Sequence, residues 1–339
     1  MLTLGLDTSC DETAAAVLSD GRDVLSNVVA SQVIHARYGG VVPEYASRAH
    51  TRMIVPVVRE ALGAAGVAFR DLEGVAVTNR PGLVGCLLVG VSFAKAVALA
   101  LEIPVVGVDH IEGHLFAVRL SRDDLRLPAV CLVASGGHSE LIVVNDWGDY
   151  QTIGRTRDDA AGEAFDKVGK LFGLDYPAGP KVERLARDGN PRAFDFPRAM
   201  MERGNLDLSF SGLKTAVRYC LEAHGRAPEG QELADFLASF QEAVIDALVT
   251  KTIRAAEAIG APTIGIGGGV AANEALRSRL SEEAARVGIE TVFPSKKLCT
   301  DNGAVIAAAG HFHLERGDRD DLTLGVSSSR EAARADRAT

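Results

Sequence analysis

Two histidines four positions apart are the residues of this chain with the clearest capacity for chemistry. His110 and His114 lie in the segment HIEGH, which follows the apolar run Pro104–Val108 after the single residue Asp109. On a helix this spacing puts both imidazoles on one face, with Cβ atoms about 5–6 Å apart, so they could share a metal ion. Such pairs are also common on helix surfaces. The apolar run predicts a buried strand, and α/β proteins hold ligands at the carboxyl ends of such strands, which favours the metal site.

A metal site of this kind needs a third protein ligand, and Asp301 is the best candidate. It lies in the segment TDNG, at the start of a helix predicted over Asp301–Leu314. Two histidines and one carboxylate with open coordination positions suit iron or zinc. A metalloprotease is disfavoured, because the HExxH and HxxEH motifs place glutamate beside a histidine, whereas Glu112 lies in the middle of the segment.

Two glycine-rich turns could hold an anion or a nucleotide. The turn SGGHS joins strands predicted at Ala129–Ala134 and Glu140–Val144, and glycines let backbone N–H groups approach an anion. A tight hairpin turn without a ligand explains this segment equally well. The second turn, in GIGGGVAAN, connects a strand predicted at Thr263–Ile266 to a helix that begins at Asn273. It lacks the GK[ST] of a phosphate-binding Walker loop.

The elements that must position these residues repeat along the chain. Strands predicted at Leu2–Leu6 and Ala14–Leu18 flank a polar turn with Asp11 and Glu12, and the second half opens with the same strand–turn–strand unit. A helix predicted over Asp158–Phe172 carries charged residues on one face, for which a solvated surface is the simpler interpretation. Residues 180–212 are predicted to be irregular, and the tail after residue 316 to be frayed.

Composition limits the class of protein. The net charge of −9 disfavours a freestanding nucleic-acid binder, so an RNA substrate would need a local basic patch or a helper protein. Five scattered cysteines without a CxxC pair indicate a reduced, cytoplasmic setting, and the N-terminus lacks the features of a signal peptide. The apolar segment Leu83–Leu101 contains Lys95 and two glycines, so we expect a core helix and no membrane span.

Ten motifs in family order make this chain resemble the TsaD family, and the resemblance runs from Leu4 to His311. It is carried by LGLDTSCDETAAAV, GGVVPEYASRAH, PGLVGCLLVG, HIEGH, LVASGGHSEL, DDAAGEAFDK, GLDYPAGP, SFSGLKTAV, IGGGVAAN and TDNGAVIA. The resemblance implies an α/β fold of the actin, sugar-kinase and heat-shock ATPase type (ASKHA), with two RNase H-like lobes and nucleotide in the cleft. It implies an N-terminal lobe over residues 1–110, a C-terminal lobe over 111–300, a helix over 301–315 that contributes to an interlobe metal site, and a flexible tail over 316–339.

The resemblance also implies roles for individual residues. His110, His114 and Asp301 correspond to the ligands of one divalent metal, iron or alternatively zinc. Asp11 and Glu12 would line the same cleft, and either could serve as the base. Asp7 stands where glutamate is common in the family, and position 183 varies there. The residues that correspond to adenylate-binding positions are Val133, Ala134, Ser135, Gly136, Gly137, Asp166, Gly179, Glu183 and Asn273.

The activity implied by the resemblance is transfer of a threonylcarbamoyl group from threonylcarbamoyl-AMP to an adenosine of tRNA. The implied partners are the proteins TsaB and TsaE, with dimerisation with TsaB through the N-terminal lobe, and the segment Lys181–Arg203 is the best candidate for a tRNA-contacting surface. An ATPase or sugar kinase of the same fold is the main alternative, and a non-catalytic scaffold related to TsaB is another. The histidine pair argues against both, because phosphoryl transfer in this fold uses carboxylates and magnesium.

Overall fold

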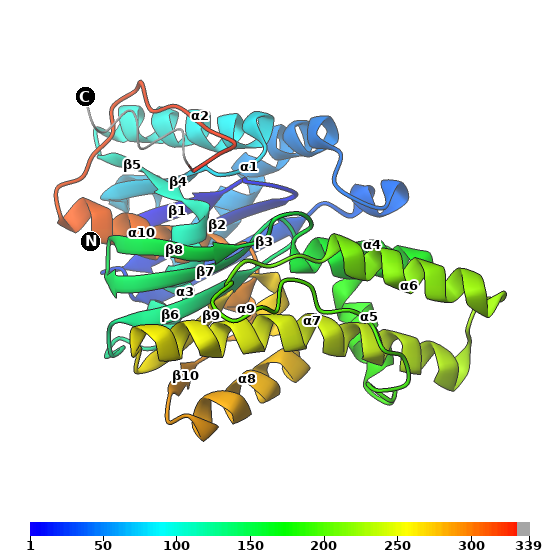
Figure 1. Ribbon diagram of the computed structural model, residues 1–339. Helices are drawn as coiled ribbons and strands as arrows, with labels where there is room; N and C mark the ends of the chain where they lie inside the picture. The colour runs from blue at the N-terminus through cyan, green and yellow to red at the C-terminus, as the bar shows by residue number, and fades with distance from the viewer. Residues whose placement is uncertain (331–339) are drawn as a thin grey trace. The chain divides into compact units, whose positions relative to one another are not determined.

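The computed structural model describes residues 1–330, and these form two compact units. Unit 1 contains Met1–Leu120 together with the chain from Asp301 onward, and unit 2 contains Ser121–Thr300. Each unit is built on one five-stranded sheet (Figure 1). The division falls after Leu120 rather than at the expected boundary between residues 110 and 111, so HIEGH belongs as a whole to unit 1.

The sheet of unit 1 has the strand order β3-β2-β1-β4-β5. The first three strands form an antiparallel meander, and β4 and β5 continue the sheet parallel to β1. The central strand β1 is buried along most of its length, as expected for a strand covered on both faces. The strands are β1 (Leu2–Asp7), β2 (Glu12–Ser19), β3 (Asp23–Ser31), β4 (Gly74–Arg80) and β5 (Val105–Asp109).

The last helix of the chain packs on the first strand. Helix α10 (Gly303–Glu315) consists largely of alanine and glycine on its buried face, which lets its backbone approach β1 closely. A Cβ atom at Gly5 would overlap the carbonyl oxygen of Gly303, so only glycine fits there. The other helices of unit 1 are α1 (Pro43–Ala65), α2 (Val84–Leu101) and α3 (His110–Ser121), with short 3₁₀ turns η1 (Val33–Tyr38) and η2 (Phe69–Asp71).

Helix α2 is long and apolar enough, by length and composition alone, to cross a membrane. In unit 1 it packs on β4 and α1 and buries one side, including Leu87, Val91 and Ala94. Its other side leaves Val84, Leu88 and Leu99 exposed. The expected core helix is therefore present, and it is one residue shorter than predicted. Apolar residues lie on both its buried side and its exposed side.

Unit 2 repeats the topology of unit 1. Its strand order β10-β9-β6-β7-β8 again places an antiparallel meander beside two parallel strands, with β6 in the central position of β1. The repeated strand–turn–strand unit predicted from the sequence is thus confirmed, and β8 is an additional strand that was not predicted. The strands are β6 (Ala129–Ala134), β7 (Ser139–Asp146), β8 (Asp149–Arg155), β9 (Thr263–Gly267) and β10 (Glu290–Val292).

The core of unit 2 is organised by α7 (Gly230–Ile259), the long yellow helix in Figure 1. Phe236 and Phe240 on α7 are completely buried and belong to one apolar cluster with residues of β6 and α4. Phe165 of α4 contacts Phe240 edge-on, with ring centroids 5.2 Å apart. The remaining helices are α4 (Ala161–Leu171), α5 (Gly179–Ala186), α6 (Ser211–His224), α8 (Glu274–Arg286) and α9 (Lys296–Cys299), with the 3₁₀ turn η3 (Gly269–Ala272).

Three predictions differ from the structure: the irregular segment from residue 180, the start of the last helix, and the frayed segment after residue 316. The segment predicted to be irregular from residue 180 begins with helix α5, because Pro180 occupies its first turn, where a missing N–H costs nothing. Helix α10 begins at Gly303 and not at Asp301, since the side chain of Asn302 accepts the N–H groups of Ala304 and Val305.

The C-terminal segment is packed, at least as far as it is described, and not frayed. Leu324 contacts the apolar core of unit 1, and the backbone of Asp320 bridges to Val105 on the edge strand β5. Ser327 N–H donates to the carbonyl of Asn79. The segment thus covers the open edge of β5, which would otherwise expose unpaired backbone groups. Residues 331–339 of the predicted flexible tail lie outside the described residues.

Candidate functional site

The structure brings the three predicted metal ligands together within unit 1. His110 and His114 lie on α3, directly after β5, and their ring centroids are 4.7 Å apart. Asp301 Oδ1 lies 3.4 Å from His110 Nε2 and 3.6 Å from His114 Nε2. One ligand atom from each residue falls within 4.8 Å of the others, a spacing that could hold a metal ion. All three ligands belong to unit 1.

His110 is oriented by groups from β1 and its following turn. Its Nδ1 lies 3.0 Å from Asp7 Oδ2 and 3.3 Å from Ser9 Oγ, while its Nε2 faces Asp301. Burial alone would lower the pKa of His110, but the carboxylates of Asp301 and Asp7 outweigh it and hold that pKa well above the usual value. The carboxylate pair thus creates a strong cation site at the His110 ring, which a proton or a metal ion can satisfy.

Glu112, the middle residue of HIEGH, does not face the metal ligands. Its Oε2 accepts a hydrogen bond from His313 Nε2 at 3.0 Å, and His313 Nδ1 lies 2.8 Å from Asp318. This pair connects α3 to α10, the helix that follows Asp301. Glu112 therefore helps to hold the two ligand-bearing segments together, a role that the motif alone did not reveal.

Replacing His313 by glutamine is expected to lower thermal stability, and more at pH 6 than at pH 9. Burial alone would lower the pKa of His313, but hydrogen bonds and charge from Glu112 and Asp318 raise it above the usual value of about 6.5. A raised folded-state pKa contributes stability that is complete below the unfolded pKa and is lost as pH rises through the folded one. Thermal melts of wild type and variant at both pH values measure the difference, expected to be roughly 1–3 kcal/mol at pH 6. An equal loss at both values would mean that the ion pair is not the source, and Glu112→Gln should reproduce the same dependence.

The two candidate bases are neighbours: Asp11 ends the polar turn between β1 and β2, and Glu12 is the first residue of β2. Burial raises the pKa of Glu12 to about 7, and the charge of Asp301 adds to this effect, whereas a hydrogen bond from Ser31 Oγ at 2.8 Å opposes it. A carboxylate with a pKa near neutrality is suited to general-base catalysis. Asp11 is partly exposed beside it. Both residues belong to the unit that contains the metal ligands.

The nine residues expected to bind an adenylate all lie in unit 2, and backbone pairing and hydrogen bonds connect their elements. Val133 pairs with Gly267 of the neighbouring parallel strand. Gly268, whose φ of +87° requires glycine, lies directly against the carbonyl of Ala134. Ser135 O accepts the N–H of Gly162 at 3.1 Å, at the start of α4. The carboxyl ends of β6 and β9 thus meet the N-terminus of α4.

The same set continues through α5 and α8. Asp166 Oδ1 accepts the N–H of Ala178 at 2.7 Å, which fixes the residue before Gly179. Glu183 Oε1 accepts the N–H of Glu274 at 2.9 Å and so caps α8 beside Asn273. Asp166 in the middle of α4 thus contacts the start of α5, and Glu183 in the middle of α5 contacts the start of α8, so the three helices are connected in series.

Two of these residues also have structural roles that the sequence did not predict. Asn273 is the N-cap of α8, and its Nδ2 donates to Gln241 Oε1 at 2.8 Å. Gln241 on α7 is buried and was missed, because one polar residue in a long apolar helix carries no signal by itself. Glu183 uses one carboxylate oxygen as a cap, and its other oxygen makes no part of this contact. A Cβ atom at Gly136 or Gly137 would meet open space, so this turn presents an accessible backbone.

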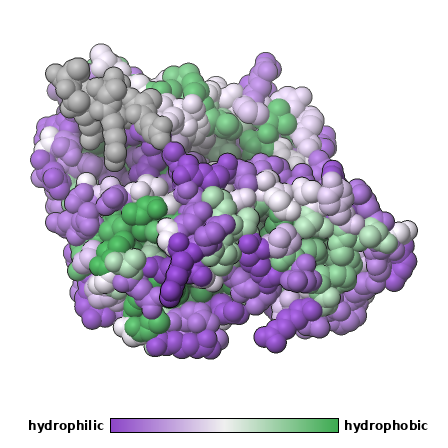
Figure 2. Space-filling view, viewed as in Figure 1, coloured by the Kyte–Doolittle hydropathy of each residue, from purple (hydrophilic) through white to green (hydrophobic). Residues whose placement is uncertain are grey.

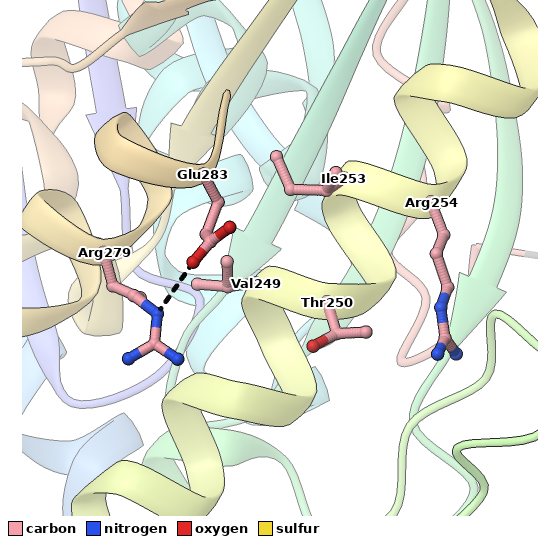
Figure 3. A pocket seen from close by; sticks show the side chains of 6 residues that line it. All are labelled: Val249, Thr250, Ile253, Arg254, Arg279 and Glu283. Carbon is pink, nitrogen blue, oxygen red and sulfur yellow. Dashed lines mark ion pairs between the residues drawn. The ribbon is translucent and has the colours of Figure 1, made fainter. Parts of the chain in front are cut away.

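A hollow of about 250 Å³ lies elsewhere on unit 2, between α7 and α8 (Figure 3). Its charged lining is already paired: Arg279 contacts Glu283 at 3.3 Å and also reaches Glu242 and Asp246. Arg254 donates to the carbonyl of Met201. The hollow contains none of the predicted site residues, and its guanidinium groups serve the fold.

The candidate tRNA-contacting segment is only partly available. Lys181 pairs with Asp175, and Arg198 with Asp246 at 2.8 Å. The remaining arginines of the segment are exposed, namely Arg184, Arg187, Arg192 and Arg203. The charge that could meet a phosphate backbone is therefore smaller than the sequence suggests.

Comparison with known proteins gives consistent results. The family model described as "TsaD: tRNA N6-adenosine threonylcarbamoyltransferase" matches residues 23–308. A protein of that name from Syntrophotalea carbinolica is 52% identical over 330 residues, which cover 97% of this chain and 96% of the relative. Another from Geobacter metallireducens is 54% identical over 325 residues, covering 96% and 95%.

Solved structures with low sequence identity share the fold. The activator of the 2-hydroxyisocaproyl-CoA dehydratase from Clostridium difficile, solved with bound ADPNP, superposes with a TM-score of 0.54 at 14% identity, over 94% of this chain and 97% of that one. The ROK hexokinase from Thermus thermophilus gives 0.50 at 17% identity, over 93% and 100%. These likenesses confirm the ASKHA fold and carry nothing about the reaction.

Proposed function

The chain belongs to the TsaD family of tRNA N6-adenosine threonylcarbamoyltransferases, and from that premise we propose that it transfers threonylcarbamoyl from threonylcarbamoyl-AMP to tRNA, with release of AMP. The acceptor is N6 of the adenosine 3′ to the anticodon in tRNAs that read ANN codons. The observation that carries the proposal is the group formed by buried His110 and His114 with partly exposed Asp301. An ATPase or sugar kinase of the same fold does not need paired imidazole ligands. The similarity of this chain to such a kinase rests on the fold alone.

The metal that this donor set fits best is a divalent ion of the first transition series, and we propose Fe²⁺, with Zn²⁺ as the alternative. Two imidazoles and one carboxylate are the ligands that such ions prefer, and Nε2 of His110 and of His114 both face Asp301. A bound ion would polarise the carbamoyl carbonyl and orient the group for attack.

The reaction itself requires one proton to be moved. The exocyclic amine of adenosine attacks the carbamoyl carbon, a C–N bond forms, and the C–O bond to the phosphate of AMP breaks. The amine is a poor nucleophile and must lose a proton as the bond forms. Glu12, whose pKa of about 7 leaves it partly ionised at neutral pH, is the preferred acceptor, and Asp11 on the same turn is the alternative.

The adenylate is proposed to bind at the end of the unit 2 sheet. Backbone N–H groups of the turn from Ser135 to Gly137 would hold the phosphate, and Asn273 with the neighbouring glycines would hold the nucleoside. Asp166 and Glu183 support this arrangement through the starts of α5 and α8.

Replacing Gly162 by alanine is expected to raise the KM for threonylcarbamoyl-AMP about tenfold or more. The new Cβ would lie 2.6 Å from Ser135 O and 2.9 Å from Gly136 Cα, so the turn must move. Displacing a packed backbone costs about 1–3 kcal/mol, and 1.4 kcal/mol corresponds to a factor of ten in binding. Steady-state kinetics against adenylate concentration measure the effect. The matched control is Gly212→Ala, where the added methyl meets open space, and an unchanged KM for Gly162→Ala would separate the turn from the substrate.

Partners are proposed for tRNA delivery and for the apolar surface of unit 1. Exposed hydrophobic residues occur on α1 and α2, and Figure 2 shows such side chains gathered over α2 at the top of the view. We assign this surface to TsaB, with TsaE acting on the resulting complex in the cytoplasm. The exposed arginines of the segment Lys181–Arg203 are proposed to contact the tRNA backbone. The surface residues on the two helices are Tyr45, Met53, Val55, Val84, Leu88 and Leu99.

A direct transfer assay tests the proposed function. The purified protein is mixed with TsaB, TsaE, synthetic threonylcarbamoyl-AMP and an unmodified ANN-reading tRNA, and the digested RNA is analysed by mass spectrometry. We expect threonylcarbamoyladenosine with this tRNA and none with a tRNA carrying guanosine at the acceptor position. Absence of product from both, together with hydrolysis of added ATP by the protein without TsaE, would favour the ATPase alternative.

A further inference from the structure

A buried carboxylate lies behind one of the metal ligands. Asp7, at the end of β1, is 1% exposed, and its two oxygens have separate partners. Oδ2 lies 3.0 Å from His110 Nδ1, and Oδ1 accepts the backbone N–H of Ser9 at 2.8 Å. The carboxylate is thus anchored to its own turn by one oxygen and meets the imidazole with the other.

When the ring of His110 is neutral, as it must be to bind a metal ion, this contact decides which nitrogen keeps its proton. An ionised carboxylate can only accept hydrogen bonds, so Nδ1 must be the N–H donor of the ring. Nε2 then presents its lone pair toward Asp301 and His114, where a metal ion would lie. Ser9 Oγ, at 3.3 Å from the same Nδ1, could accept or donate and therefore specifies no tautomer by itself.

We propose that Asp7 is a positioning residue for the metal centre: it fixes the orientation and tautomer of His110 so that Nε2 is available as a ligand. The inference rests on the proposed metal site, but not on the transfer reaction. Carboxylates behind metal-bound histidines typically change metal affinity about 10–100-fold. Asp7 and His110 are 103 residues apart in sequence, so this pairing exists only in the folded unit.

The test compares the Zn²⁺ affinity of the wild-type protein with the affinities of Asp7→Asn and Ser9→Ala. In Asp7→Asn the amide oxygen can keep the bond to Ser9 N–H, which leaves the NH₂ group toward His110 Nδ1. That group donates, so the ring would place its proton on Nε2 and lose its ligand lone pair. Competition for Zn²⁺ with a chromophoric chelator is expected to give about 10–100-fold weaker binding for Asp7→Asn. For the matched control Ser9→Ala, we expect a change of less than about threefold, since the carboxylate remains in place.

The possible outcomes distinguish the role of Asp7 from that of Ser9 and from the existence of the metal site. Wild-type affinity in Asp7→Asn would overturn the positioning role while leaving the metal site intact. A loss in Ser9→Ala as large as in Asp7→Asn would assign the orientation to the hydroxyl instead. If the wild-type protein does not bind Zn²⁺, the metal centre fails, and this inference fails with it.

A second measurement does not depend on any variant being folded. Long-range ¹H–¹⁵N NMR spectra of the zinc-loaded wild-type protein distinguish the two histidine tautomers. We expect His110 with the proton on Nδ1 and the metal on Nε2. A proton on Nε2, or coordination through Nδ1, would overturn the proposal.

Discussion

Replacing Asp301 by asparagine is expected to lower the rate of threonylcarbamoyl transfer by at least about 10³-fold. The carboxylate is the only charged member of the donor set, and its Oδ1 lies 3.4–3.6 Å from both imidazole Nε2 atoms. An asparagine of the same shape leaves a weak, neutral oxygen ligand and no cavity. Loss of several kcal/mol of electrostatic stabilisation at the carbonyl corresponds to this factor, since 1.36 kcal/mol is a tenfold change in rate.

The measurement combines single-turnover transfer with metal analysis of the same samples. Bound iron or zinc is expected to fall together with activity. The matched control is Asp149→Asn, an exposed aspartate of β8 in unit 2, which should retain wild-type rate and metal content. Full activity of Asp301→Asn after its metal has been removed would keep the enzyme but assign the metal a structural role.

Replacing Glu12 by glutamine is expected to lower kcat/KM about 10²–10⁴-fold and to remove its dependence on pH near neutrality. Burial, followed by the charge of Asp301, raises the pKa of Glu12 to about 7. A base acts only in its ionised form, so the wild-type rate should fall about tenfold for each pH unit below 7 and level off above it. The comparison requires kcat/KM of both proteins between pH 5.5 and pH 8.5.

The same substitution should stabilise the protein at alkaline pH. A carboxyl group whose folded-state pKa is raised above its unfolded value of about 4.3 contributes stability at low pH that is lost as pH rises through about 7. At pH 8 the wild type holds an unfavourable, partly buried charge that glutamine avoids, so Glu12→Gln should melt a few degrees higher. Such a gain with loss of activity is typical of a functional residue.

Asp11→Asn separates the two candidate bases. If Asp11 takes the proton, its variant loses the pH profile and Glu12→Gln keeps it. Retention of the profile in both single variants would exclude each as the sole base and would point to a group outside this turn.

Several features of the protein could be predicted from the sequence because they depend on short spacings. The pairing of His110 with His114 follows from four positions on one helix, and the repeated strand–turn–strand units follow from local alternation and turn residues. The ends of α2 were predicted to within one residue, because glycine and proline mark such boundaries. The short helix α5 was not predicted, because it has too few buried residues to show a helical periodicity in the sequence.

Only the tertiary structure decided which distant residues meet. Asp301 reaches the histidines because the glycine- and alanine-rich α10 packs closely on β1, a contact between the two ends of the chain. Asp7 behind His110 and His313 behind Glu112 depend on the same packing. Sequence alone determined the ligand types, the fold class and the family of this protein. The three-dimensional arrangement decided the partners of each ligand, because long-range contacts depend on shape complementarity that no local pattern encodes.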